Sequence, residues 1–318
     1  MTATADLTWR DYIDHLAARL GFDRSGHRVR PGLYRLNNPS PESPVFASAG
    51  YTLSFDALRS SLAGRDAWLL VLDTMGINVW CAAGKGTFGT DELVRRIRLA
   101  DLAGQVSHRT IILPQLGAPG VSARSVAQQS GFHVRWGPVR AADLPAFLDA
   151  GEASPAMRRV TFPLRDRIVL IPVELAHALP YALAASAVAI FFGHADIAGT
   201  VLLSVAAGTV LFPVLLPYLP AKDYTVNGLL LGFAVITPVV AAGGGGTGWP
   251  GLLWAGGNLL LWPAITAFLA LNFTGCTPFT SRSGVKLEIS RYMRIIAAMA
   301  AGGAAALALA LLHAGGMA

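Results

Sequence analysis

The carboxyl-terminal half of this chain is nearly free of charge and consists mainly of long apolar runs. Of the 25 Lys and Arg residues and the 19 Asp and Glu residues among 318, only five and four, respectively, follow residue 167. Each run is close to the roughly 20 residues that a helix needs to cross a bilayer. The sequence therefore predicts an all-α transmembrane domain over residues 168–318, with five spans at 168–192, 197–219, 226–242, 252–271 and 295–313.

Cations flank these spans unevenly. The connections 193–196 and 243–248 hold no Lys or Arg, whereas the segments on the other side hold nine: Arg158, Arg159, Arg165, Arg167, Lys222, Arg282, Lys286, Arg291 and Arg294. This asymmetry predicts a multi-pass protein of the inner (cytoplasmic) membrane, with a cytoplasmic amino-terminal domain and the carboxyl terminus outside. The first 30 residues lack the pattern of a cleavable signal peptide, which agrees with that expectation. The net charge of +6 reports topology, so we expect no nucleic-acid partner.

Residues 1–167 alternate between strand-like and helix-like segments. Alternation of this kind, with glycine and proline in the loops after the strands, predicts an α/β domain with a parallel, Rossmann-like sheet. We expect residues 1–21 to contain an amphipathic helix whose apolar side packs on this domain, and residues 31–44 to form a loop. The remaining strands are expected at 67–72, 109–113 and 132–136, and the helices at 54–62, 90–102, 122–129 and 142–148.

One of the two cysteines stands in an unusual run, Asn78–Lys85, which reads N-V-W-C-A-A-G-K. Because this run follows strand 67–72, we expect Cys81 at the carboxyl end of a strand, the edge where open α/β sheets bind ligands. A cysteine among such neighbours is more often a small buried hydrophobe than a reactive group. Lys85 shifts that balance, because it is the only lysine in the first 221 residues and a cation one helical turn away favours a thiolate.

The loops 114–120 and 136–138 are expected at the same sheet edge as Cys81. Glycine-rich loops around one thiol predict a wide cleft lined by backbone, which suits a large flat cofactor better than a phosphate. The second cysteine, Cys276, is far away in the sequence. Two cysteines cannot hold an iron–sulfur cluster, so we expect none in this chain and expect electrons for any redox step to come from another protein.

Four features together resemble the corrinoid protein of microbial mercury methylation. They are the run N-V-W-C-A-A-G-K, the segment Leu113–Val121 (L-P-Q-L-G-A-P-G-V), the segment Gly137–Arg140 (G-P-V-R) and the multi-span tail. The soluble domain of that family is similar to the corrinoid-binding domain in the large subunit of the corrinoid iron–sulfur protein. The resemblance implies a cobalt corrinoid of the cobalamin type, with Cys81 as the catalytic residue and, through its sulfur, the lower axial ligand to cobalt.

The resemblance also implies a reaction, a partner and a binding site. The reaction is methyl transfer from methylcobalt to mercuric ion, giving methylmercury; a thiolate opposite the methyl group supplies electron density for transfer to an electrophile. The partner is a ferredoxin-like protein with two four-iron four-sulfur clusters, which would reduce the cobalt. The implied corrinoid-binding residues are Ser48, Tyr51, Thr52, Ser54, Asn78, Val79, Trp80, Ala82, Ala83, Gly84, Lys85, Gln115, Leu116, Gly117, Ala118, Pro119, Gly120, Val121, Gly137 and Pro138.

Two other functions stay open on the sequence alone. The first keeps the corrinoid but passes the methyl group to a different acceptor. The second, of another class, is a membrane transporter or sensor whose soluble domain binds some other ligand. The lone thiol at a sheet edge favours a corrinoid function over a transporter. The sequence defines no role for Cys276, or for Glu174 and His177 near the start of the first span.

Overall fold

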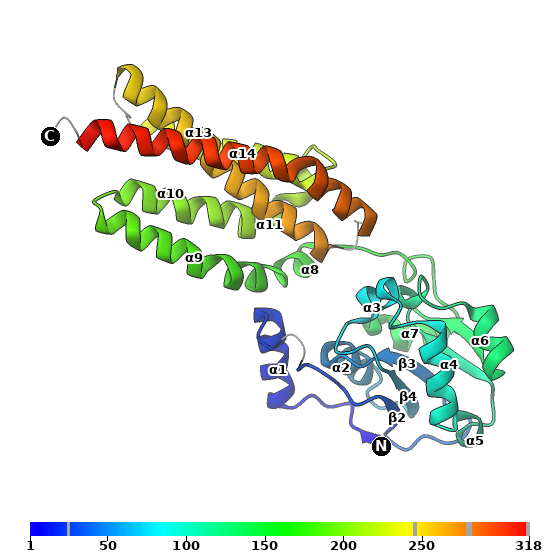
Figure 1. The fold of residues 1–318 in the computed structure, drawn as a ribbon. Helices are drawn as coiled ribbons and strands as arrows, with labels where there is room; N and C mark the ends of the chain where they lie inside the picture. Colours follow the sequence, from blue (N-terminus) through cyan, green and yellow to red (C-terminus); the bar gives the residue numbers. More distant parts are fainter. Residues whose placement is uncertain (24–25, 244–246, 278–281, 316–318) are drawn as a thin grey trace. The chain divides into compact units, whose positions relative to one another are not determined.

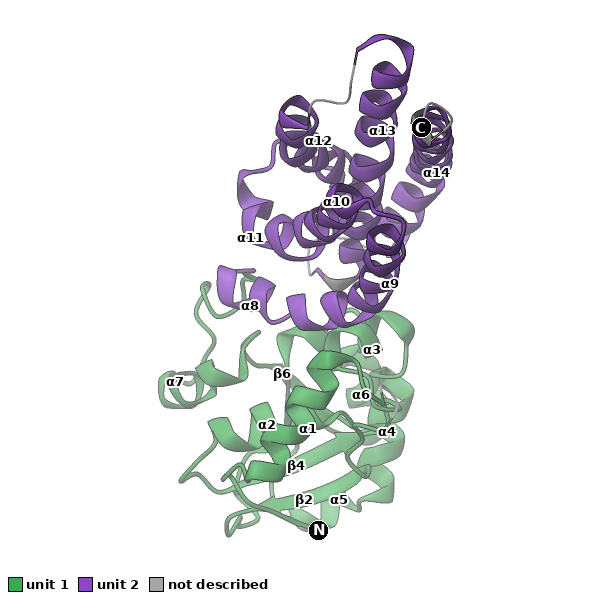
Figure 2. Ribbon diagram, turned by 90° about the vertical axis from the view of Figure 1, so that its left-hand side faces the viewer, with its two compact units in different colours: residues 1–161 green, residues 162–318 purple. Residues whose placement is uncertain are grey.

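The computed structural model describes residues 1–23, 26–243, 247–277 and 282–315. The chain divides into two compact units, Met1–Thr161 and Phe162–Ala318 (Figure 2). The charge distribution placed the domain boundary after residue 167, which lies inside the first helix of the second unit, α8 (Leu164–Ile168).

The first unit is built on one six-stranded sheet with the strand order β1-β2-β4-β3-β5-β6. Figure 1 labels three of its strands, β2, β4 and β3, which lie side by side. The strands β4, β3, β5 and β6 are parallel to one another, whereas β2 runs antiparallel to β4 and carries β1 at its outer edge. The prediction of a mostly parallel α/β sheet is confirmed. The strand bounds are β1 (Thr2–Ala3), β2 (Gly32–Leu36), β3 (Val45–Ala49), β4 (Ala67–Leu72), β5 (Thr110–Leu113) and β6 (His133–Trp136).

The expectation of a loop over residues 31–44 was wrong for β2. This strand pairs along its whole length with β4, and its register places Tyr34 opposite Leu69. Gly32 and Arg35 conceal the strand in the sequence, because glycine weakens a strand and a charged side chain interrupts the apolar pattern. Pairing with the fully buried β4 decides the structure here.

Apolar side chains fill both faces of the central strands. On β3, Val45, Ala47 and Ala49 enter the core beneath α3 and α4, whereas Phe46 enters the core beneath α2 and α7. This alternation is the two-residue period of a strand covered by helices on both sides. The helices of the unit are α1 (Trp9–Leu20), α2 (Thr52–Ser61), α3 (Val79–Lys85), α4 (Thr90–Leu99), α5 (Leu102–Gln105), α6 (Ala123–Ser130) and α7 (Leu144–Ala150).

The helix predicted near the amino terminus forms, but its apolar side chains do not pack on the domain as we expected. No residue of α1 is buried. Trp9, Tyr12, Ile13 and Leu16 are all more than half exposed. Polar side chains on the other side of the helix make the contacts with the rest of the unit.

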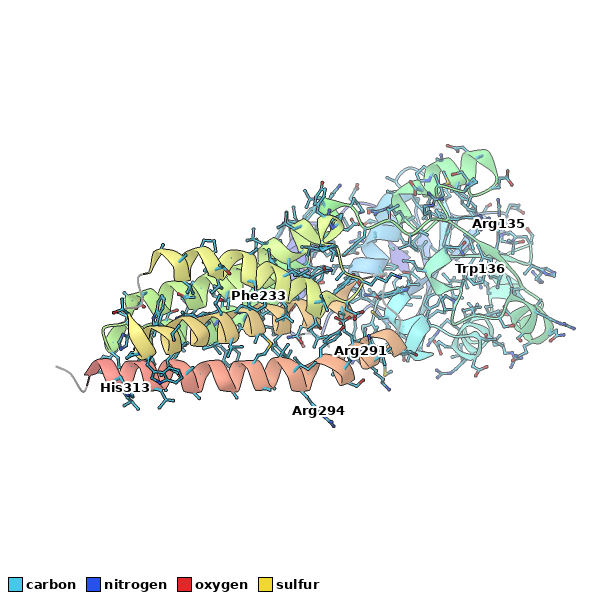
Figure 3. All side chains as sticks on the ribbon, turned by 90° about the horizontal axis from the view of Figure 1, so that it is seen from above. Arg135, Trp136, Phe233, Arg291, Arg294 and His313 are labelled. Carbon is cyan, nitrogen blue, oxygen red and sulfur yellow. The ribbon has the colours of Figure 1, made fainter. Side chains whose placement is uncertain are left out.

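The second unit is helical, and its described residues contain five helical segments long and apolar enough to cross a membrane, which confirms the number of predicted spans. The cationic side chains Arg291 and Arg294 lie toward one end of α14, and His313 lies toward the other (Figure 3). The five candidate spans are Leu164–Phe191, Ala195–Tyr218, Tyr224–Ala242, Gly248–Phe273 and Ser283–His313. They correspond to α8 with α9 (Ile171–Phe191), α10 (Ala195–Ala206) with the short helices up to Tyr218, α12 (Tyr224–Ala242), α13 (Gly248–Phe273) and α14 (Arg282–Gly315).

Small residues let α13 approach its neighbours closely. A Cβ atom at Gly232 of α12 would lie 2.6 Å from the Cα of Pro263, and one at Gly303 of α14 would lie 2.5 Å from the backbone nitrogen of Leu261. Neither position has room for any larger side chain. Close backbone approach at small residues is the usual way in which helices associate within a bilayer.

Arg167 joins the beginning of the first candidate span to the end of the second. Its Nη1 donates to the carbonyl oxygens of Pro213 and Val214, at 2.7 and 2.6 Å. The Pro213 carbonyl has no donor four residues along, because residue 217 is a proline. The guanidinium of Arg167 therefore supplies a hydrogen bond that the helix backbone cannot make.

Candidate functional site

The cysteine run forms a helix, not the glycine-rich loop at a strand end that we expected. After β4, the chain passes through residues 73–77 and then forms α3 (Val79–Lys85). Asn78 is the N-cap, and its side-chain oxygen accepts a hydrogen bond from the backbone N–H of Cys81 at 2.9 Å. This is the usual capping interaction of an asparagine, and it makes the first turn helical despite the small residues that follow.

The burial of α3 decides where the thiol points. Val79, Ala82 and Ala83 are buried, and all three belong to the core beneath the sheet. Their spacing of three and four residues marks one side of a helix. Cys81 is only partly buried and Lys85, four residues later, is exposed. The thiol therefore lies on the side of α3 that faces away from the core.

The surface beside Cys81 is open. A Cβ atom added at Gly84 or at Gly86 would meet nothing within 4 Å among the described residues. Gly84 follows Cys81 by three residues and so lies beside it on the helix. A thiol next to a bare glycine backbone leaves a flat ligand free to approach the sulfur closely.

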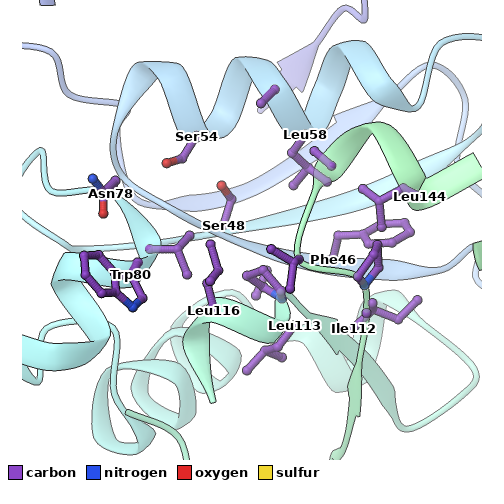
Figure 4. Close-up of a pocket in the computed structure, with 18 residues that line it drawn as sticks. Phe46, Ser48, Ser54, Leu58, Asn78, Trp80, Ile112, Leu113, Leu116 and Leu144 are labelled. Atoms are coloured by element: carbon purple, nitrogen blue, oxygen red, sulfur yellow. The ribbon is translucent and has the colours of Figure 1, made fainter. Parts of the chain in front are cut away.

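A cavity of about 310 Å³ adjoins the beginning of α3 (Figure 4). Asn78, Val79 and Trp80 line it from α3 and its cap. The other walls come from the middle of β3, from α2, from the end of β5 and from the segments that follow β5 and β6, up to the beginning of α7. Its apolar lining residues are Phe46, Ala47, Ala57, Leu58, Ile112, Leu113, Pro114, Leu116, Pro138, Val139, Ala141 and Leu144.

The cavity lies where the order of the strands reverses. From β3 the chain moves to β4 on one side, and then crosses to β5 on the other side of β3. In open α/β sheets, this switch point between neighbouring strands is where the loops diverge and ligands bind. The topology thus places the cavity at the position that the fold favours for a ligand.

Two serine hydroxyls, together with the side chain of Asn78, provide polar atoms in this mainly apolar cavity. Ser48 of β3 is 3% exposed, and Ser54 belongs to the first turn of α2. Figure 4 shows both hydroxyls at the cavity, near Asn78 and Trp80. Neither hydroxyl forms a hydrogen bond with a described residue of the protein. A buried hydroxyl normally has a partner, so Ser48 is suited to hydrogen-bond a ligand that enters the cavity.

The structure brings together part of the predicted site. Of the predicted residues, those that line the cavity are Ser48, Ser54, Asn78, Val79, Trp80, Leu116, Gly137 and Pro138. Cys81, Gly84 and Lys85 lie on the outward side of α3. Ala82 and Ala83 are buried in the core, and Tyr51 packs against the same core. The hydroxyl of Thr52 donates to Asp14 at 2.6 Å, outside the cavity.

The loop after β5 supports α3 more than it lines the cavity. A Cβ atom at Gly120 would lie 2.2 Å from the carbonyl oxygen of Phe88 and 3.0 Å from the Cα of Ala83. A Cβ atom at Gly117 would lie 2.6 Å from the Phe88 ring. Gln115 accepts a hydrogen bond from Arg158 at 3.1 Å. Of the other predicted residues here, Ala118 and Pro119 are not buried, and Val121 belongs to the core.

From the sequence we expected no G-x-G-x-x-G pattern to open a helix, and that expectation was wrong, because such a pattern ends at the N-cap of α4. Gly84, Gly86 and Gly89 have the spacing G-x-G-x-x-G, which in dinucleotide-binding folds joins a strand directly to a helix. Here Gly86 ends α3 in the left-handed conformation, and Gly89 is the N-cap of α4. The pattern therefore joins two helices, which is not the arrangement that holds a pyrophosphate.

Sequence reasoning missed the apolar wall of the cavity. Phe46, Leu58, Ile112 and Leu144 come from four separate elements, and each fits an ordinary core pattern. Only the strand order could have brought them together.

The side chain of Cys276, the second cysteine, lies outside the described part of the chain. Its backbone falls in a short 3-10 helix, Thr274–Cys276.

Known proteins resemble the first unit. Residues 17–148 match a family described as CO dehydrogenase/acetyl-CoA synthase delta subunit. The acetyl-CoA decarbonylase/synthase complex subunit gamma of Methanopyrus kandleri is 32% identical over 128 residues, which are 40% of this chain and 27% of that protein. The subunit gamma of Archaeoglobus fulgidus is 30% identical over 128 residues, with the same shares. That of Methanocaldococcus jannaschii is 35% identical over 97 residues, 30% of this chain and 20% of that protein.

These similarities cover a limited part of each protein. The chain spans less than a third of the length of these relatives, and the family match ends before the second unit begins. The helical unit therefore has no counterpart in the family match. What the matches describe is the α/β unit that carries Cys81 and the cavity.

Proposed function

We propose that the first unit binds a cobalt corrinoid and that the protein acts as a corrinoid-dependent methyl carrier. The observation that carries this proposal is the placement of Cys81 on the outward side of α3, beside the cavity at the strand switch point. The similarity to subunits of acetyl-CoA decarbonylase/synthase complexes supports the same class of protein.

The residues present fit such a cofactor. A corrinoid is large and flat, so it needs a wide open surface next to a metal ligand, with polar contacts for the amide groups at its rim. The bare surface at Gly84 and Gly86 provides the space. The sulfur of Cys81 provides a soft donor for the metal, and the unpartnered hydroxyl of Ser48 provides a polar contact inside the adjoining cavity.

Each group has a definite role in this proposal. Cys81 would hold the metal through its sulfur, and Asn78 fixes the first turn of the helix that presents the thiol. Ser48 and Ser54 bind polar groups at the rim of the cofactor, and the apolar wall of the cavity excludes water from the part that enters. When bound, the corrinoid supplies a metal centre that accepts and releases a methyl group, and a thiolate ligand increases its electron density.

The acceptor that we propose is mercuric ion, with methylmercury as the product. The support is the resemblance of Asn78–Lys85 and of the associated segments to the mercury-methylation family. Mercuric ion is an electrophile, so it needs a methyl group that is transferred with its bonding electrons, and the sulfur of Cys81 would supply electron density to a bound metal that favours such a transfer. A methyl carrier with another acceptor is the second candidate, favoured by the similarity to the decarbonylase/synthase subunits.

We further propose that the helical unit anchors the protein in the inner membrane with the first unit in the cytoplasm. A ferredoxin-like protein with two four-iron four-sulfur clusters would supply electrons to the metal and thiols for mercury delivery. Five apolar helical segments support the anchor, and the uneven distribution of cations supports the orientation. Protease added outside intact cells should leave residues 1–167 uncut; cleavage there would reverse the topology.

The first test is spectroscopic. The purified full chain, loaded with cobalamin, should show a visible spectrum that differs from that of base-off cobalamin with water as its lower ligand. Cys81→Ala should abolish this difference while the protein remains folded, because alanine fits easily on an outward helix position. An unchanged spectrum in Cys81→Ala would show that the thiol is not a metal ligand.

The second test concerns the acceptor. Cells that express the native chain with its ferredoxin-like partner should form methylmercury, and Cys81→Ala should abolish that activity. Cys276→Ala is the control and should retain at least part of it. Arg or His in place of Lys85 should cost less activity than the loss of Cys81. A native pair that binds cobalamin but forms no methylmercury would favour the second candidate.

A further inference from the structure

The helix α1 presents an apolar stripe to its surroundings. Trp9, Tyr12, Ile13 and Leu16 are 67%, 61%, 57% and 58% exposed. Their spacing of three, four and seven residues places them on one side of the helix. Phe22, directly after the helix, is 63% exposed. The exposed side of α1 is therefore the side that a soluble domain would ordinarily bury.

The polar side of α1 is fastened to the domain. The Asp11 carboxylate lies 2.9 Å from the Arg59 guanidinium, and the His15 imidazole lies 2.8 Å from the Asp56 carboxylate. Asp14, between them in the sequence, accepts from the ring of His27 at 2.7 Å. The helix cannot roll to bury its apolar stripe without breaking these contacts.

The anchor for these contacts is itself buried. Arg59 is 7% exposed, and it also donates to Asp56 at 2.6 Å and to the carbonyl oxygens of Thr4 and Asp6 at 2.8 and 2.7 Å. A buried guanidinium with four acceptors has a fixed geometry. Arg59 contacts both the segment before α1 and the helix itself, so these contacts fix the direction in which the apolar stripe points.

We propose that α1 is an interfacial helix that lies in the headgroup region of a bilayer with its apolar stripe among the lipid chains. Tryptophan and tyrosine are the side chains that favour this region, because each combines an apolar ring with a polar group. Trp9 and Tyr12 occupy one end of the stripe, and Ile13 and Leu16 continue it. This is the composition of a membrane-surface helix.

The exposed charges of the helix favour anionic lipids. Asp11, Asp14 and His15 are turned toward the domain, whereas Arg10 and Arg19 are exposed near the two ends of the helix. The guanidinium of Arg10 lies 5.5 Å from the centre of the Trp9 ring. Cations of this kind reach phosphate groups while their aliphatic parts stay beside apolar side chains.

The proposed membrane anchor holds the first unit, and with it α1, close to lipid. The first unit ends at Thr161, and the first candidate span begins at Leu164. A domain attached to a bilayer by so short a connection meets lipid at a high effective concentration, so even a weak interfacial helix is occupied. A single 12-residue helix presents much less than the area of a standard protein interface, which makes a protein partner or a second copy less favourable.

The test is tryptophan quenching in the full chain. The protein is placed in vesicles of phosphatidylcholine with a minor fraction of phosphatidylglycerol, and the emission of Trp9 is obtained as the difference between the native protein and Trp9→Phe. Lipids brominated on their acyl chains should quench most of this emission, and aqueous iodide should quench little of it. The emission of Trp68, obtained from Trp68→Phe in the same way, should respond to neither, because Trp68 is 7% exposed within the α/β unit.

A pair of variants separates the stripe from general effects of polarity. Replacement of Ile13 and Leu16 by aspartate should abolish quenching by brominated lipid and expose Trp9 to iodide. The matched control is Leu99→Asp, since Leu99 is 65% exposed on α4, away from the stripe. This control should leave the Trp9 quenching unchanged.

Three outcomes would overturn the proposal. Quenching of Trp9 by iodide in the native vesicles would show that water covers the stripe. Protection from both quenchers that depends on protein concentration would assign the stripe to a second copy. Protection that requires an added protein would assign it to a partner. Because no step uses cobalamin, the proposal can fail while corrinoid binding stands, and the reverse also holds.

Discussion

The side chain of Asn78 and the backbone of Cys81 are joined by a hydrogen bond of 2.9 Å. This contact closes the first turn of α3, and it is the reason that the thiol has a helical position at all. A helix of seven residues has little stability of its own, so its first turn depends on the cap and on the packing of its inner side.

Asn78→Ala should loosen this turn. The loss of an N-cap costs about 1 kcal/mol, and here the cost falls on the few residues that present the thiol. We expect faster amide hydrogen exchange at residues 79–85 and a weaker retention of cobalamin. Asn78→Asp keeps an acceptor at the same position and is the control. Equal exchange in the two variants would show that the cap does not hold α3.

Gly84 and Gly120 should respond to alanine in opposite ways. Gly84→Ala adds a methyl group where no described atom lies within 4 Å, and alanine in a helix is more favourable than glycine by about 0.5–1 kcal/mol. Gly120→Ala places its methyl group against the backbone of Phe88 and Ala83, and such overpacking costs about 1–3 kcal/mol or more. Thermal unfolding of the cobalamin-free protein should show both shifts.

Gly84→Ala should have opposite effects on stability and on cobalamin binding. If the cofactor lies over the outward side of α3, the added methyl group lifts it away from the sulfur, so Gly84→Ala should bind cobalamin more weakly although the protein is more stable. Equilibrium binding, measured by the cobalamin spectrum, checks this expectation. Binding as tight as that of the native protein would place the cofactor elsewhere.

Ser48→Ala should have little effect on the empty protein. Its hydroxyl lines the cavity and has no partner among the described residues, so its removal leaves no other group unsatisfied and is expected to be neutral or slightly stabilising. If that hydroxyl binds the cofactor, the same change should weaken cobalamin binding by about 1 kcal/mol, or roughly fivefold. Thr52→Ala is the comparison outside the cavity and should leave cobalamin affinity unchanged.

The attachment of α1 should weaken at alkaline pH. Both ring nitrogens of His27 face oxygen atoms, Asp14 Oδ1 at 2.7 Å and the Phe22 carbonyl at 2.8 Å, so the protonated ring satisfies both contacts. Burial alone would lower the pKa of His27, but its hydrogen bonds to Phe22 and Asp14 outweigh burial and raise the pKa above 6.5. A raised pKa gives stabilisation that is complete below pH 6.5 and is lost as the pH rises through the raised value.

Hydrogen exchange at residues 9–20, measured across this pH range in the detergent-solubilised full chain, tests the expectation. Exchange should accelerate more with pH in the native protein than in His27→Gln, which lacks the imidazole contacts to Asp14 and Phe22 but keeps the other attachments of α1. The same pH dependence in both would show that the imidazole does not hold the helix.

The sequence was most informative where structure depends on local pattern. The five apolar spans and the buried strand β4 are continuous apolar segments, so length and composition sufficed for them. Cys81 could be singled out from its neighbours and from Lys85, but its helical setting could not. The small and apolar residues after Asn78 fit a loop and a short helix equally well, and the cap at Asn78 together with the packing of the inner side of α3 decides for the helix.

Features that depend on distant residues were not predictable. The cavity wall joins Phe46, Leu58, Ile112 and Leu144, which meet only because the strands are ordered around β3. The direction of α1 was also hidden. Its apolar spacing predicts burial of that side, and only the buried Arg59 and Asp56, more than 40 residues away, turn the polar side inward.

Arg167 has a mechanical consequence for the second unit. The turn at residues 192–194 connects α9 to α10 at one end, and the hydrogen bonds from Arg167 to Pro213 and Val214 fasten the same two spans at the other. A helical hairpin closed at both ends cannot slide lengthwise by one turn, a displacement of about 5.4 Å by which packed elements shift past one another in some conformational switches. Any motion that shifts one of these helices along its axis must therefore carry the other with it.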